Sequence, residues 1–306
     1  MSTPVKRVAA IHDLSGFGRI SLAVVIPILS TMGLQVCSLP TAILSTPTGG
    51  FKNYKFIDLT EHMEEYIKHW KELSLKFEGI YTGFLGSSRQ IDIISKFIKE
   101  FSKEDTLVVI DPVMGDEGKL YGTMDEEMVQ KMRKYIGLAH IITPNFTEAA
   151  RLLNKPYQLE ITEKEIKNWL VNLAQMGPQI VIVTSVPESN LSKNTSVIAY
   201  NKEDGRFWKV KCEYIPAYYP GAGDIFTSVI TGSILQGDSL PVAIDRGVQF
   251  ITAGIRASYG YSYPQREGIV LEKVLPNLNM PVIISSYEIL AVSYTHLRAH
   301  ETPEHL

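Results

Sequence analysis

The sequence predicts an α/β protein whose central sheet is mostly parallel, with one antiparallel hairpin at its edge. Short apolar runs typical of buried strands alternate with stretches of helical spacing over most of the chain. The alternation stops after residues 180–184, where two strand-like runs flank residues 201–205, and the Asp-Gly pair in that segment is a hairpin signal. The length of 306 residues fits one large α/β domain or two small ones.

Composition and charge are those of a globular protein without a polyanionic partner. Apolar residues make up 45% of the chain and charged residues 21%, and the net charge is −3. The sequence contains no basic block, which argues against nucleic acid or an anionic membrane as a partner. No apolar run approaches the roughly 20 residues that span a bilayer, and the N-terminus lacks the apolar core of a signal peptide. Cys37 and Cys212 are expected as buried reduced thiols, as in a cytoplasmic protein.

The first part of the chain predicts strand–loop–helix units. The expected elements are a strand at 7–11, a helix at about 20–32, a strand at 34–39, a helix at about 58–73 and a strand at 79–82. The first loop contains Gly16 and Gly18, but Ser21 stands where a dinucleotide fingerprint has its third glycine. The second strand ends without an acidic residue for a ribose, so a nicotinamide site is disfavoured. The hydroxyl-rich residues 44–51 fit either a ligand-facing loop or a solvated turn.

The middle of the chain places polar side chains at predicted strand ends. The further elements expected are strands at 106–110, 139–143, 180–184, 195–200 and 206–211, and helices at 162–176, 221–236 and 240–258. Asp111 follows a β-branched run, at the ligand-binding edge of an open α/β sheet. The polar loop 115–122 fits a flap over a nucleotide or an ordinary surface loop. Asn145 and Glu148 could face one ion or form a capping box, and their spacing alone favours the capping box.

Residues 219–226, Tyr-Pro-Gly-Ala-Gly-Asp-Ile-Phe, are the strongest candidate for chemistry. Gly221 and Gly223 allow a tight turn before an apolar helix, and the first amides of that helix form an anion site. Asp224 would repel an anion there unless it has a task, such as accepting a proton from a substrate hydroxyl while the amides hold a phosphoryl group. A glycine-rich turn with Asp224 as helix cap explains the motif about equally well.

In their order and spacing, these motifs resemble those of the ribokinase superfamily and, within it, the pyridoxal (vitamin B6) kinases. The resemblance covers about residues 5–278 and rests on the segments 12–18, 45–50, 111–116, 142–148, 183–185 and 221–224. It implies a ribokinase-like three-layer α/β/α sandwich that phosphorylates the 5′-hydroxymethyl group of pyridoxal, pyridoxamine or pyridoxine. ATP would be the co-substrate and Mg²⁺ the cofactor, with a monovalent cation left open. A homodimer is also implied.

The resemblance further implies roles for individual residues. Asp224 would be the catalytic base, expected to stay ionised, and the amides of Gly221, Ala222 and Gly223 would stabilise the transferring phosphoryl group. The residues expected along ATP are Asp111, Asn145, Glu148, Thr184 and Ser185, of which Asp111 and Glu148 would also serve Mg²⁺, largely through water. The residues expected around the vitamer are Asp13, Ser15, Ser45, Thr46, Thr48, Phe84, Tyr121 and Asp224.

Several alternatives stay open. Many pyridoxal kinases have a ring-contacting serine in the first loop, and here Asp13 and Ser15 are equal candidates for its place. The charge of Asp13 suggests a preference for pyridoxamine. A hydroxymethylpyrimidine kinase of thiamin synthesis is the nearest rival function, and a non-catalytic vitamer-binding protein is the rival from another class. A sugar kinase is less favoured, because the N-terminal region lacks an obvious extra β lid.

The expected organisation is a single kinase domain, residues 1–291, followed by a non-native tail. Residues 292–306 are unlike the family and resemble the translation of a sequencing-library adapter. His296 and His300 in this tail have the i, i+4 spacing of metal ligands, but the origin of the tail makes a metal site there an unfavoured interpretation.

Overall fold

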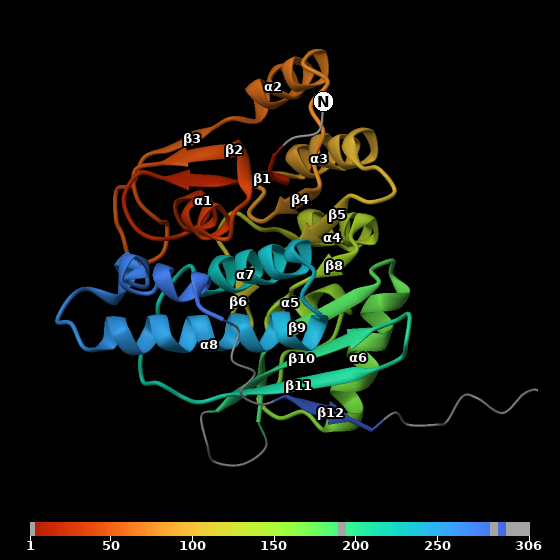
Figure 1. Cartoon of the computed structure of the whole chain (residues 1–306), viewed down its shortest axis with the longest axis vertical. Helices are drawn as coiled ribbons and strands as arrows, with labels where there is room; N and C mark the ends of the chain where they lie inside the picture. The colour runs from red at the N-terminus through yellow and green to blue at the C-terminus, as the bar shows by residue number, and fades with distance from the viewer. Residues whose placement is uncertain (1–3, 189–193, 282–286, 292–306) are drawn as a thin grey trace, which may run out of the picture.

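A central sheet runs through the molecule, and helices cover both of its faces (Figure 1). The computed structural model describes residues 4–188, 194–281 and 287–291. In that part of the chain the sheet has ten strands, in the order β12-β11-β10-β9-β8-β5-β4-β1-β2-β3. The strands are β1 (Arg7–Ser15), β2 (Gln35–Leu44), β3 (Phe56–Asp58), β4 (Gly79–Thr82), β5 (Leu107–Ile110), β8 (Ile141–Ile142), β9 (Ile180–Pro187), β10 (Thr195–Asn201), β11 (Phe207–Cys212) and β12 (Glu288–Leu290).

Most of the sheet is parallel. The neighbours from β2 through β1, β4, β5 and β8 to β9 pair in parallel. The β10–β11 hairpin and β12 extend this sheet antiparallel at one edge, and β3 pairs antiparallel with β2 at the other. The predicted parallel sheet with an antiparallel edge hairpin is therefore confirmed. Because parallel strands end on the same side, the residues that follow them meet at one edge.

The helices form two layers. They are α1 (Leu22–Thr31), α2 (Thr60–Glu72), α3 (Ser88–Phe101), α4 (Glu126–Tyr135), α5 (Phe146–Leu152), α6 (Glu163–Gln175), α7 (Ala222–Gln236) and α8 (Leu240–Tyr259). Apolar residues of α2 to α6 share one core cluster with the sheet, and those of α1, α7 and α8 share the cluster on the opposite face. Helix α7 also contributes to a third cluster with α1 and α8, so it is buried on nearly all sides from Ile225 onward, while its first turn is half-buried or exposed.

The structure differs from the predicted elements mainly where strands are longer or shorter than the apolar runs suggest. Strand β2 continues to Leu44 instead of ending near Leu39, although Pro40 cannot donate a ladder hydrogen bond. The proline is tolerated because β3 begins to pair with β2 only at Ala42. The short strand β3 was not predicted, nor was the hairpin of β6 (Gly115–Asp116) and β7 (Lys119–Leu120) within the polar loop. Strands of two or three residues carry too little periodicity to be recognised.

Other predictions concern the thiols, the membrane and the tail. Cys37 and Cys212 are both free, as expected, but they are half-buried instead of fully buried. Among the helices of the described ranges, none combines the length and the apolar character needed to cross a membrane. The predicted tail, residues 292–306, and with it His296 and His300, lies outside the described residues.

Candidate active site

Polar side chains of several segments meet at the carboxyl edge of the parallel strands. Asp13 and Ser15 lie in the last residues of β1, Asp111 directly follows β5, and Asn145 and Thr184 form an isolated bridge beyond β8. Helix α7 begins at the same place. A Cβ added to Gly223 would lie 3.8 Å from Asp111 Oδ2, and the Tyr81 hydroxyl of β4 donates to the Asp224 carbonyl at 3.3 Å.

The turn before α7 requires a glycine at its N-cap. Gly221 has a φ of 85°, and a Cβ there would collide with the carbonyl oxygen of Arg19. The helix has no side-chain cap hydrogen bond. The alternative interpretation of Asp224 as a helix cap is therefore wrong. The first amides of α7, which have no partner within the helix, are left for another group.

The Asp224 carboxylate is bound from another segment of the chain. Its Oδ2 accepts a hydrogen bond from the Ser21 amide at 2.9 Å, and its Oδ1 lies 3.9 Å from His12 Nδ1. Burial raises the pKa of Asp224 to about 7; the bond from Ser21 opposes this rise, and the nearby Asp13 carboxylate adds to it. This rise differs from the expectation that Asp224 stays firmly ionised near the helix N-terminus.

Ser21 joins two carboxylates and was missed as a site residue. Its hydroxyl donates to Asp13 Oδ1 at 2.6 Å while its amide donates to Asp224. Its φ of 49° lies in the left-handed region, which is unusual for serine and turns both donors toward the site. Burial raises the pKa of Asp13, and the Ser21 hydroxyl opposes this rise. The only sequence signal was a serine directly before an apolar helix, which indicates an ordinary cap.

Asp111 and Glu148 form a second acidic pair at this edge. Both are buried, with 5% and 3% of their surface exposed. Burial, together with the charges of Glu148 and Asp224, raises the pKa of Asp111. Burial raises the pKa of Glu148 to about 8, against the opposing effect of backbone hydrogen bonds. Within the described ranges neither carboxylate forms an ion pair with a lysine or arginine. A cation between them would compensate this buried negative charge.

Asn145 and Glu148 form the capping box that their spacing suggested. The Asn145 side chain accepts from the Glu148 amide at 2.9 Å, and Glu148 Oε2 accepts from the Asn145 amide at 2.8 Å. Glu148 Oε1 accepts from Met114 N at 3.0 Å, and Asn145 Nδ2 donates to Gly115 O at 2.8 Å. The two side chains thereby fix the start of the β6–β7 hairpin to α5, so the polar loop is a hairpin anchored on this helix.

The structure supports a role in the site for some of the remaining candidate residues better than for others. Ser15 is buried and its hydroxyl has no hydrogen-bond partner within the described part of the chain, whereas Asp13 already accepts from Ser21. Phe84 is half-buried and packs against the core under α2 and α3, and Tyr121 is 42% exposed beside the β6–β7 hairpin. Burial, followed by the charge of Glu148, raises the pKa of Tyr121. Ser185 is exposed, with a φ of 56°.

The loop after β2 touches the first loop. Ser45 and Thr48 are exposed and Thr46 is half-buried; Ser45 Oγ accepts from Lys55 N at 2.8 Å, and Thr46 donates to the Pro47 carbonyl at 3.2 Å. A Cβ on Gly18 would lie 2.9 Å from the Pro47 ring, so the two loops are in contact. None of these contacts reaches Tyr121, which lies beside the β6–β7 hairpin.

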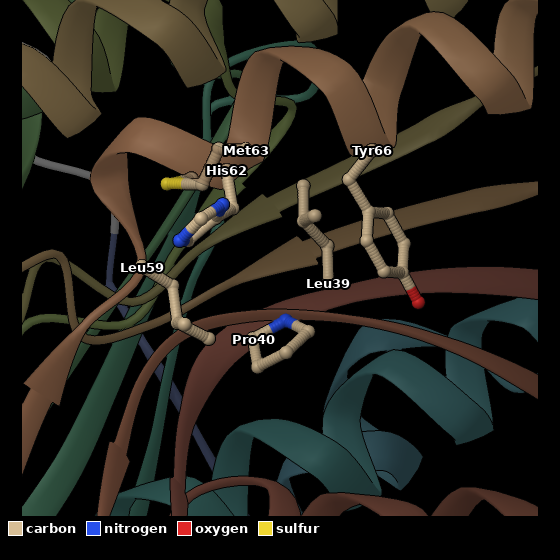
Figure 2. Close-up of a pocket in the computed structure, with 6 residues that line it drawn as sticks. All are labelled: Leu39, Pro40, Leu59, His62, Met63 and Tyr66. Carbon is tan, nitrogen blue, oxygen red and sulfur yellow. The ribbon is translucent and has the colours of Figure 1, made fainter.

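An apolar groove of about 210 Å³ lies elsewhere, between β2 and α2 (Figure 2). It is lined by Leu39, Pro40, Leu59, His62, Met63 and Tyr66. Leu39 and Met63 belong to the core on the α2 face of the sheet, opposite the face that α7 covers. None of these lining residues is acidic, and none belongs to the N-terminus of α7, so this groove is not the candidate active site.

The fold and the open N-terminus of α7 beside Asp224 define a ribokinase-type α/β protein. Residues 26–268 match the model of the phosphomethylpyrimidine kinase family, and the chain belongs to this family. Its curated relatives include the pyridoxal kinase of Arabidopsis thaliana, 32% identical over 189 residues. That match covers 60% of this chain and 59% of the relative, so it spans less than two thirds of the plant protein.

Two solved structures are similar over nearly the whole chain. A Bacteroides thetaiotaomicron protein, provisionally assigned as a phosphomethylpyrimidine kinase and crystallised with pyridoxal, is 57% identical, with a TM-score of 0.91. The match covers 94% of this chain and all of that one. The pyridoxal kinase of Lactobacillus plantarum is 28% identical, with a TM-score of 0.82 over 90% of this chain and 97% of that one. The predicted fold, superfamily and kinase class are confirmed by these matches.

Proposed function

We propose that this protein transfers the terminal phosphoryl group of ATP to the 5′-hydroxymethyl group of a vitamin B6 vitamer. The observation that carries the proposal is the N-terminus of α7, which no side chain of the described residues caps and which lies beside the half-buried carboxylate of Asp224. An open helix N-terminus attracts a phosphoryl group, and a carboxyl with a pKa of about 7 is matched to accept a proton at neutral pH. The similarity to a protein crystallised with pyridoxal supports the vitamer as substrate.

In this mechanism the chain acts mainly by positioning. Phosphoryl transfer passes through a loose, in-line transition state, which requires alignment of the hydroxyl with the phosphoryl group and stabilisation of the charge. The amides of Gly221, Ala222 and Gly223 would hold the transferring oxygens, and Asp224 would take the hydroxyl proton late in the step. Burial of α7 on nearly all sides from Ile225 onward keeps these donors in place while the charge develops.

The nucleotide would lie on the hairpin side of the site. Asp111 and Glu148 fit Mg²⁺, because they are buried acidic groups without an ion-pair partner among the described residues. Both Glu148 oxygens already accept backbone hydrogen bonds, so its contribution would pass through water. When bound, the ion neutralises phosphate charge. Asn145, Thr184 and Ser185 would lie along the phosphates, and a monovalent cation stays part of the proposal.

The vitamer would lie on the side of the first loop. Its pyridine ring would be enclosed by the first loop and by Ser45, Thr46 and Thr48, with Phe84 at its border. Tyr121, beside the hairpin, would lie where it can touch either the vitamer or the nucleotide. Ser15 is the better candidate for a direct ring contact, because its buried hydroxyl has no hydrogen-bond partner in the described ranges, whereas Asp13 accepts a hydrogen bond from Ser21.

A hydroxymethylpyrimidine kinase is the second candidate, favoured by the description of the matching family. ADP release with Mg-ATP tests both when pyridoxal, pyridoxamine, pyridoxine and hydroxymethylpyrimidine are offered separately, with Asp224→Asn as control. Turnover of B6 vitamers that is lost in the control supports the proposal. Turnover of the pyrimidine alone would transfer the protein to thiamin synthesis, and vitamer binding without turnover would indicate a binding protein.

We also propose that one kinase domain, residues 1–291, acts as a homodimer in the cytoplasm. The two free cysteines support a reducing compartment. All three residues of the edge strand β3 are exposed, and two of them, Phe56 and Ile57, are large and apolar, which supports an interface there. Light scattering of the purified protein measures the oligomeric state, and a monomer at micromolar concentration would contradict the dimer.

A further inference from the structure

His12 is a buried imidazole that has no hydrogen-bond partner among the residues the structure describes. The residue has no exposed surface, and neither Nδ1 nor Nε2 is bonded. Its ring lies against the backbone of Gly83, where an added Cβ would overlap it, and edge-on to Tyr81 with ring centroids 4.3 Å apart. Buried polar side chains are almost always bonded, so an orphaned ring at the candidate active site calls for a physical explanation.

The carboxylate of Asp224 lies beside this ring. The distance from His12 Nδ1 to Asp224 Oδ1 is 3.9 Å, too long for a hydrogen bond but within reach after a small rotation of the aspartate. Burial lowers the pKa of His12 to about 3, so the ring is neutral and the contact is not an ion pair. The other ionisable groups that face Asp224 are Asp13, Asp111 and Tyr81.

The two oxygens of Asp224 are not equivalent. Oδ2 accepts the Ser21 amide at 2.9 Å, and a proton placed on Oδ2 would compete with this bond. Oδ1 has no hydrogen-bond donor among the described residues, and it is the oxygen that faces His12. A proton that reaches Asp224 is therefore best accommodated on Oδ1, where the new hydroxyl needs an acceptor.

We propose that His12 is a positioning residue that accepts a hydrogen bond from Asp224 once Asp224 has received the substrate proton. The inference rests on the proposed function. The substrate O–H bond breaks as its oxygen bonds to phosphorus and the bond from phosphorus to the ADP oxygen breaks. The proton passes to Asp224 Oδ1, and the new carboxylic hydroxyl donates to the lone pair of His12 Nδ1. The proton leaves to water as the product departs, so the histidine stays neutral throughout.

This bond would form only as the proton arrives. An interaction that is absent from the ground state and present near the transition state raises kcat without tightening substrate binding. Such a bond also accounts for the unbonded ring. Burying the imidazole of His12 without a partner costs free energy in the resting enzyme, and the hydrogen bond in the reacting state offsets that cost.

Three variants at His12 separate this role from simple packing. His12→Leu removes the acceptor, His12→Asn places an amide oxygen near the position of Nδ1, and His12→Gln places one near Nε2. We expect kcat to fall about tenfold in His12→Leu and His12→Gln, with KM for vitamer and ATP unchanged, and to recover in His12→Asn. The paired amides have the same chemistry, so a difference between them reports the position of the acceptor and not the polarity of the site.

The double variant with Asp224→Asn completes the test. Because His12 acts through Asp224, His12→Leu should not lower the residual kcat of Asp224→Asn any further. Equal kcat in the Asn and Gln variants, a change confined to KM, or full additivity with Asp224→Asn would overturn the inference. If the Leu variant does not fold, the Asn and Gln pair decides. A wild-type protein without turnover on any vitamer would instead overturn the proposed function.

Discussion

Helices α5 and α7 both begin at the carboxyl edge of the sheet with an acidic residue in the first turn, yet their N-termini are built in opposite ways. At α5, Asn145 and Glu148 satisfy each other's backbone amides, and Glu148 also accepts from Met114. At α7, a glycine is the N-cap, no side chain caps the helix, and Asp224 accepts from Ser21 of another segment. The α5 terminus is closed by its own side chains, whereas the α7 terminus is left open.

This difference shows which acidic residue is available for chemistry. Glu148 has two fixed backbone donors, one on each carboxylate oxygen, so its first task is structural. Asp224 has one fixed donor on Oδ2, and its Oδ1, which faces His12, has no donor among the described residues. An oxygen without a fixed donor can exchange a proton without breaking the fold, which is what a general base requires.

Asp224→Asn is expected to have the largest effect on activity, and it tests the difference between the N-termini of α5 and α7 most directly. Loss of the base should lower kcat by about 10²–10⁴-fold, while the Kd for ATP stays within a few-fold. The asparagine oxygen can still accept the Ser21 amide, so the thermal midpoint should not fall. Steady-state kinetics, nucleotide titration and a melting curve measure the three quantities.

Glu148→Gln is the matched control at α5. Glutamine has a single acceptor oxygen, so its NH₂ group must face one of the two backbone amides that the glutamate satisfies. Leaving such a donor unpaired should cost about 1–3 kcal/mol of unfolding free energy. A thermal midpoint that falls in Asp224→Asn but not in Glu148→Gln would show that the two termini have been assigned the wrong way round.

The second effect is a pH dependence set by Asp224. The base must be ionised, so kcat/KM should rise about tenfold per pH unit up to the pKa near 7 and then level off. Stability should change in the opposite direction. The folded-state pKa of Asp224 is raised above its usual 3.8, so the folded protein binds the extra proton between about pH 4 and 7. The contribution of this group to stability is lost as the pH rises through that window.

The Asp224→Asn variant separates the contribution of Asp224 from that of Glu148, whose pKa is raised from 4.5 to about 8 and whose stabilising effect is lost over this overlapping pH range. Chemical denaturation of both proteins from pH 4 to 8 gives the difference. An acid limb of kcat/KM well below pH 5 would show that the resting carboxyl is far more acidic than its burial implies.

The third effect concerns the glycine that opens α7. Gly221→Ala should destabilise the protein by about 1–3 kcal/mol, because its φ is 85°, and should also lower activity, because the Cβ would displace the Arg19 carbonyl beside the site. Gly237→Ala is its control at the other end of the helix: its φ is 97°, but a Cβ there meets nothing within 4 Å. Equal activity losses in both variants would mean that the N-terminal turn has no catalytic role.

The sequence was sufficient to predict the parallel sheet and the motifs at its edge, because both depend on local patterns. Apolar runs mark buried strands, and the Asn-x-x-Glu spacing defines the capping box that the structure contains. It was not sufficient for Ser21, whose importance depends on a positive φ and on Asp224, which lies 203 positions away in the chain. Nor could it indicate that His12 is unbonded or that burial raises the pKa of Asp224, since both properties follow from what surrounds the side chain.

The smallest effect should come from Ser21→Gly, which separates the two hydrogen bonds that Ser21 donates. Glycine keeps the amide that binds Asp224 and adopts a φ of 49° without strain, but it removes the hydroxyl that binds Asp13. Catalysis by Asp224 should therefore continue, with kcat for pyridoxal within a few-fold of wild type. Asp13 loses its partner, so any effect of its charge on substrate choice should grow.

If Asp13 favours a protonated amine, the ratio of kcat/KM for pyridoxamine to that for pyridoxal should exceed one in the wild type and rise further in Ser21→Gly. Measuring both ratios in parallel decides this, with Asp13→Asn as the charge-free control. A ratio several-fold below one in the wild type would count against Asp13 as an amine-selecting group. A large loss of kcat in Ser21→Gly would mean that the hydroxyl helps to hold Asp224, and the open terminus of α7 would then depend on both donors of Ser21 instead of its amide alone.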